Sequence, residues 1–197
     1  MITWLIKLLS KLRFPFFKRP NLKSKAYHNI CYKAQVGDIL LTTSRAFFLN
    51  TFNPSRDYKH AGIITRVEKH SNTIWITEAT SRGVVLTELF DFFEDKTDIA
   101  LLRYDTPDLL DEVAARAESK LGLKYDYNFE SDNKKYYCFE LIVEAFKYFP
   151  NFLIEKVTPE WIFPLSMFNI FKGKRYLAES FTENPRFKLI YKRSVDV

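Results

Sequence analysis

Residues 60–89 read HAGIITRVEKHSNTIWITEATSRGVVLTEL, and this stretch decides the fold class. It holds three runs rich in β-branched residues, 60–67, 73–79 and 83–89, which are separated by short segments of turn-forming residues. Because both connections are short, the three runs are predicted to form an antiparallel meander.

The segments on either side of the meander predict a mixed domain. Residues 36–43 and 99–104 are further strand-like runs, and residues 187–191 predict a final strand. Residues 108–121 and 138–148 carry apolar side chains three and four positions apart, which is typical of amphipathic helices. Strands that are grouped, with helices after them, indicate the α+β class.

The positive charge is concentrated near the N-terminus. The 197 residues carry a net charge of +6, but residues 1–37 contain eight Lys and Arg residues and no acid, so the rest of the chain has a charge of −2. A nearly neutral domain does not favour a nucleic-acid groove, and no nucleic-acid partner is expected. We divide the chain into a basic amphipathic arm, residues 1–35, and a domain, residues 36–197.

The arm has two interpretations. Lys7 and Lys11 lie at helical spacing opposite Leu5 and Leu9, as in helices that lie on a membrane surface, but a helix packed on its own domain explains the pattern equally well. The apolar run is too short to span a membrane, and no cleavage site follows it. Together with only two cysteines, this predicts a reducing, cytoplasmic location, where residues 1–20 allow peripheral contact with the inner face of the membrane.

Cys138 and His60 are the candidate reactive residues. Cys138 begins a predicted helix, and a helix N-terminus or a neighbouring imidazolium stabilises a thiolate. A cysteine at such a place is more often a small buried residue. His60 begins a strand, and the small Ala61 and Gly62 that follow allow close approach to another element. The alternative for His60 is a strand-edge histidine bonded to solvent.

Glu78 is the candidate third member of this group. In a hairpin of residues 60–67 and 73–79, an even register sum places Glu78 nearly opposite Gly62 and on the face of His60. A carboxylate there can orient the imidazole and stabilise the imidazolium, although an exposed strand position is equally consistent with the periodicity. The histidines and cysteines show no metal-ligand spacing, so no metal and no cofactor are expected.

Five short motifs, in a fixed order, point to a family. They are GDILL (37–41), HAGI (60–63), EA (78–79), GLKYD (122–126) followed by Phe129, and YCFELI (137–142). Together they resemble the permuted papain-like amidases of the YaeF/YiiX type, within the NlpC-like superfamily of cysteine hydrolases. In this family the His-bearing strands precede the Cys-bearing helix, unlike in ordinary papain-like enzymes. The resemblance implies a circularly permuted papain-like fold, with an antiparallel β-meander packed against the Cys-bearing helix.

The resemblance also implies roles for individual residues. Cys138 would be the nucleophile, His60 the general base and Glu78 the orienting group. Tyr125 matches the family's Gly-x-x-Tyr-Asp motif and is expected to line the site or to stabilise an oxyanion with the backbone N–H of Cys138. Phe139 stands where the family usually has Ser, so it either narrows the cleft or packs inward.

These observations predict a cysteine hydrolase, an amidase or peptidase that cleaves an amide bond through an acyl-enzyme. Its substrate would be a peptidoglycan-type peptide or an acylated small molecule. The alternative is a lipid-directed thiol acyltransferase or thioesterase at a membrane surface, which the Phe-rich composition and the basic arm favour. A third hypothesis is a binding module without catalysis, but such a module has no physical reason to keep Cys138, His60 and Glu78 together.

Overall fold

A computed structural model describes residues 23–44, 55, 57–94, 96–105, 109–129, 133–149, 152–157 and 174–193. The strands are β1 (Ile39–Ser44), β2 (His60–Glu68), β3 (Thr73–Thr80), β4 (Gly83–Glu88), β5 (Lys96–Tyr104) and β6 (Phe187–Arg193). The helices are α2 (Lys23–Lys33), α4 (Leu89–Phe92), α5 (Leu110–Glu118), α6 (Cys138–Phe146) and α7 (Glu179–Thr182).

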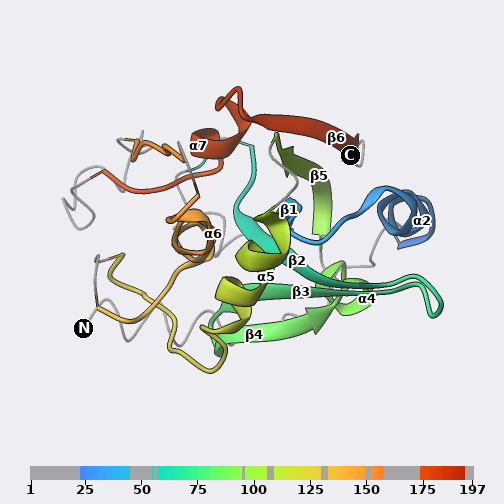
Figure 1. The fold of residues 1–197 in the computed structure, drawn as a ribbon, viewed down its shortest axis with the longest axis horizontal. Helices are drawn as coiled ribbons and strands as arrows, with labels where there is room; N and C mark the ends of the chain where they lie inside the picture. Colours follow the sequence, from blue (N-terminus) through green and yellow to red (C-terminus); the bar gives the residue numbers. More distant parts are fainter. Residues whose placement is uncertain are drawn as a thin grey trace.

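The strands form one antiparallel sheet in the order β4-β3-β2-β1-β5-β6 (Figure 1). The predicted α+β class and the meander of β2, β3 and β4 are confirmed. The strand predicted over residues 36–43 begins only at Ile39, because Gly37 has a φ of +83° and the carboxylate of Asp38 accepts the N–H of Gln35. These contacts form a turn that leads into β1.

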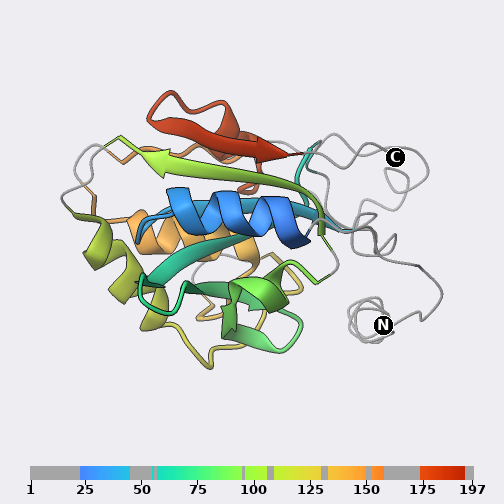
Figure 2. The ribbon, with the colours of Figure 1, turned by 90° about the vertical axis from the view of Figure 1, so that its right-hand side faces the viewer.

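Helices cover both faces of the sheet. Figure 1 shows α5 and α6 on one face and α2 on the other, and Figure 2 shows α2 in front of the strands and α6 behind them. Ala26 and Ile30 of α2 are fully buried against the sheet. Residues 1–22, which include the predicted membrane-contact segment, lie outside the described residues. Among the described helices, none has both the length and the apolar character needed to cross a bilayer.

An aromatic cluster holds α6 against the sheet. Phe146, in the last turn of α6, is fully buried, and four rings lie with their centroids 5.1–5.8 Å from its own. They belong to Tyr104, Phe149, Phe152 and Phe187. Such pairs add to the free energy gained from burying the rings. The cluster therefore fixes the C-terminal end of the helix whose first residue is Cys138.

Candidate active site

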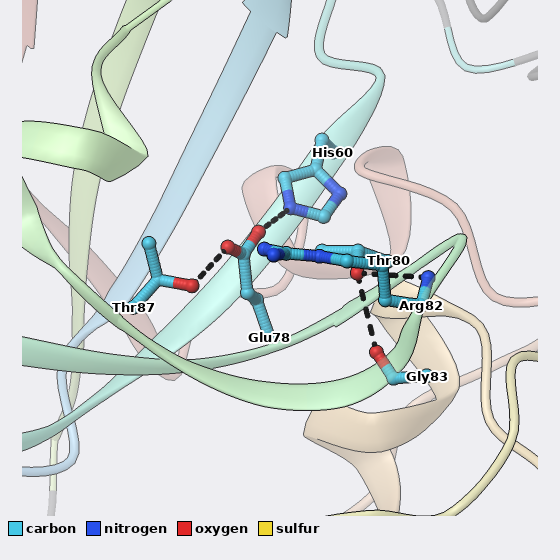
Figure 3. A network of polar contacts seen from close by, with 6 residues as sticks. All are labelled: His60, Glu78, Thr80, Arg82, Gly83 and Thr87. Carbon is cyan, nitrogen blue, oxygen red and sulfur yellow. Dashed lines mark hydrogen bonds and ion pairs between the residues drawn. The ribbon is translucent and has the colours of Figure 1, made fainter. Parts of the chain in front are cut away.

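The β2–β3 hairpin brings His60 and Glu78 together. Gly62 pairs with Glu78, so the register sum is even, as predicted, and the side chains of His60 and Glu78 lie on one face of the sheet. Nε2 of His60 lies 2.6 Å from Oε2 of Glu78 (Figure 3). This hydrogen bond fixes the orientation of the imidazole ring.

The carboxylate of Glu78 is buried and fully hydrogen-bonded. Its second oxygen, Oε1, accepts the hydroxyl of Thr87 on β4 at 2.6 Å (Figure 3). Burial alone would raise its pKa, but the hydrogen bonds from His60 and Thr87 and the charge of Lys96 outweigh burial and lower the pKa of Glu78. Glu78 is therefore held as a carboxylate.

Gly62 leaves the space in which this pair packs. A Cβ at this position would lie 2.4 Å from Cγ2 of Ile76 and 3.3 Å from the ring of Phe92. The Phe92 ring itself lies 5.8 Å from the ring of His60, between centroids. A larger residue at position 62 would therefore push apart the strands that hold His60 and Glu78.

Cys138 is a further group that acts on His60. It is the first residue of α6, as predicted, and is only 3% exposed. Burial alone would lower the pKa of His60, but hydrogen bonds with Cys138 and Glu78, and their negative charges, raise it to about 9. The imidazolium is thus the favoured form of His60 at neutral pH.

The N-terminus of α6 keeps its N–H groups available. Its N-cap residue, Tyr137, makes no side-chain cap, and its hydroxyl instead accepts the N–H of Tyr176 at 2.9 Å. The first N–H groups of a helix have no partner within the helix, and here the N-cap side chain does not occupy them. They can therefore polarise a carbonyl oxygen placed beside Cys138.

Glu140, in the first turn of α6, adds no full negative charge to this end of the helix at neutral pH. Burial and the charge of the buried Asp126 raise the pKa of Glu140 to about 8. Asp126 is held beside the helix start, since its N–H donates to the carbonyl of Tyr136 at 3.2 Å. A mainly protonated Glu140 leaves the helix N-terminus free to stabilise a thiolate.

Tyr125 lies near enough to Cys138 for its charge to act on the phenol, whereas Phe139 packs into the core. Burial and the charge of Cys138 raise the pKa of Tyr125 far above its ordinary value, so its hydroxyl stays protonated and able to donate. Phe139 is 1% exposed, and its ring stacks on Phe181 with 6.0 Å between centroids. It therefore packs inward, the second of the two arrangements expected for it.

Two contacts of the pair were not anticipated from the sequence. Thr87 pairs with Ile76, two positions from Glu78 on the neighbouring strand, so the register of the second hairpin would have revealed it. Phe92 lies on α4, a helix of four residues, which is too short to leave a periodic signal.

The described residues contain no group of three or more His, Cys, Asp and Glu side chains that could hold a metal ion. The candidate site combines the thiol of Cys138 with an imidazole and a carboxylate that hydrogen-bond to one another. Such a set serves nucleophilic and acid–base chemistry.

A family model described as "permuted papain-like amidase enzyme, YaeF/YiiX, C92 family" matches residues 33–191. The chain belongs to this family. It is therefore a cysteine hydrolase of the YaeF/YiiX amidase family. The crystal structure of the metalloprotein YiiX from Escherichia coli O157:H7 is similar, with a TM-score of 0.69 and 18% identity over 83% of this chain and 99% of that one. This likeness shows the permuted papain-like fold. A search of curated proteins found no match.

Proposed function

We propose that Cys138, His60 and Glu78 act as a catalytic triad that hydrolyses an amide bond. The observation that carries the proposal is that the imidazole of His60 hydrogen-bonds to a buried carboxylate, while Cys138, at a helix N-terminus, raises the pKa of the same imidazole. The carboxylate holds the ring in place and stabilises the imidazolium, so the thiolate can attack while a proton stays available.

The reaction has two steps. Sγ of Cys138 attacks the carbonyl carbon, and the C–N bond breaks as His60 gives its proton to the leaving amine. Water then attacks the thioester carbon and loses its proton to His60, and the acid is released as Cys138 leaves as a thiolate. The N–H of Cys138 and the hydroxyl of Tyr125 stabilise the oxyanion in both steps.

We propose peptidoglycan-type peptides as the substrate class and test the proposal with soluble peptidoglycan fragments. Release of new amino groups should fall by about 1,000-fold or more in Cys138→Ala, since the nucleophile is lost. Cys31→Ala is the matched control and should keep the wild-type rate. Amine release that persists in Cys138→Ala would contradict the triad.

The second candidate function is transfer or hydrolysis of a lipid acyl group at the inner face of the cytoplasmic membrane. It rests on the basic, amphipathic sequence of residues 1–20. We expect the full chain to bind vesicles that contain anionic lipid, with binding that weakens as salt rises. The triple substitution Lys7→Gln, Lys11→Gln, Arg13→Gln should abolish this binding, and undiminished binding would remove the support for a membrane-directed reaction.

A further inference from the structure

The turn between β3 and β4 holds an arginine beside the triad. The turn consists of Ser81 and Arg82, and it closes the hairpin that carries Glu78. The N–H of Arg82 donates to Oγ1 of Thr80 at 3.2 Å, and the hydroxyl of Tyr127 donates to the carbonyl of Ser81 at 3.1 Å. The backbone of Arg82 is thereby tied to its own strand and to the loop that leads to α6.

The residue after the turn tightens this attachment. Gly83 has a φ of +106°, and a Cβ there would lie 2.4 Å from the carbonyl oxygen of Leu123. The N–H of Val84 donates to that same oxygen at 2.8 Å. The long side chain of Arg82 therefore extends from a fixed point.

The guanidinium of Arg82 is exposed, and the part of the chain that the structure describes offers it no hydrogen-bond or ion-pair partner. Four other arginines each pair with a carboxylate at 2.7–2.8 Å, namely Arg66, Arg103, Arg116 and Arg186. In Figure 3 the side chain of Arg82 runs from the turn in the direction of Glu78 and His60. An arginine at this place is available to a group that enters from solvent.

A hollow of about 530 Å³ beside β4 gives such a group room. Its lining includes Arg82, Trp75, Leu86, Thr87, Glu88 and Asp91. Thr87, which also lines the hollow, donates its hydroxyl to Glu78, so one residue of the lining contacts the carboxylate of the triad.

The charges of the hollow are divided between its ends. Arg82 precedes β4, whereas Glu88 ends the strand and Asp91 follows it. Because Gly62 pairs with Glu78, His60 lies level with the end of β3 that leads into Arg82. The two acids repel an anion from the far end, and Arg82 attracts it to the end next to His60.

We propose that Arg82 binds an anionic group of the substrate, a carboxylate or a phosphate, next to the bond that is cleaved. This inference rests on the proposed function and narrows its substrates to amides that carry such a group. A guanidinium presents a planar fork of N–H donors that matches two oxygens of either group. Glu78 and Cys138 cannot bind an anion in this way, since both are negative or act as acceptors when the enzyme is active.

The test compares two reagents that differ only in charge. Iodoacetate carries a carboxylate where iodoacetamide carries a neutral amide, and both alkylate Cys138. We measure both rate constants at Cys138, at pH 7 and low salt, and divide that of iodoacetate by that of iodoacetamide. This ratio cancels any general change in thiol reactivity. We expect this ratio to fall by about tenfold in Arg82→Gln, which loses one charge-assisted pair, and to fall less in Arg82→Lys.

Lys69→Gln is the matched control, because it removes the same charge from the distant β2–β3 turn and should leave the ratio unchanged. An unchanged ratio in Arg82→Gln would overturn the inference while Cys138 stays reactive. If neither reagent prefers Cys138 to Cys31 in the wild type, the proposed function fails and the inference fails with it. Protection of Cys138 by acetate or by inorganic phosphate identifies which anion Arg82 prefers, and protection by neither rules out an anion site.

Discussion

Iodoacetamide at pH 7 is expected to alkylate Cys138 about 100-fold faster than Cys31, and His60→Ala should remove most of that difference. The reason is the imidazolium, which the site favours at this pH and which stabilises a thiolate at the start of α6. Among the described residues the side chains that act on Cys31 are Tyr27 and Glu88 and not an imidazole, and burial raises the pKa of its thiol. Time courses of alkylation at the two cysteines, followed by mass spectrometry of their peptides, measure both rates.

A histidine far from the site provides the control. His70 lies exposed in the β2–β3 turn, and His70→Ala should leave both rates unchanged. Glu78→Gln keeps the shape of the carboxylate but not its charge, so its rate at Cys138 should lie between those of the wild type and His60→Ala. Slow and equal alkylation of both cysteines in the wild type would contradict an activated thiol.

The second large effect is on stability. Phe146→Ala should lower the free energy of unfolding by about 3–5 kcal/mol, because it removes a fully buried ring and leaves a cavity among four others. Urea unfolding followed by tryptophan fluorescence measures the loss, provided that the slope of the transition is unchanged.

Tyr148→Ala is the matched control for this substitution. Tyr148 lies just beyond the end of α6 and is 68% exposed, so its removal should cost less than about 1 kcal/mol. Comparable losses in the two variants would mean that the aromatic cluster does not hold α6 in place.

Local patterns predicted the meander well and the rest of the sheet only in part. A short connection left few ways to pair β2 and β3, and of these the structure has the even register sum. The position of β1 between β2 and β5 did not follow, because strand pairs distant in sequence leave no local signal. The helix α2 was not predicted either, since the fully buried apolar residues among its described side chains are only Ile30 and the small Ala26.

The residues of the candidate site also differ in how far the sequence predicted them. The hairpin pairs His60 with Glu78 only if its register sum is even, whereas the role of Cys138 came from the order of motifs that the family shares. The orientation of Phe139 stayed open because neighbouring residues on a helix point about 100° apart, and only packing on Phe181 decides which one faces the core. Arg82 was not singled out, since a charged residue in a turn is ordinarily solvated.

The order of the three triad positions along the chain has a consequence for synthesis. His60 and Glu78 come from one short hairpin, while Cys138 follows Glu78 by 60 positions, on a helix whose anchoring rings include Phe187 of the last strand. Hairpins form from local contacts, and contacts between distant residues form late. A chain leaving the ribosome would thus carry the base and its carboxylate long before a thiol docks beside them. Under the proposed function, acylation of Cys138 would therefore begin only after β6 has packed against α6.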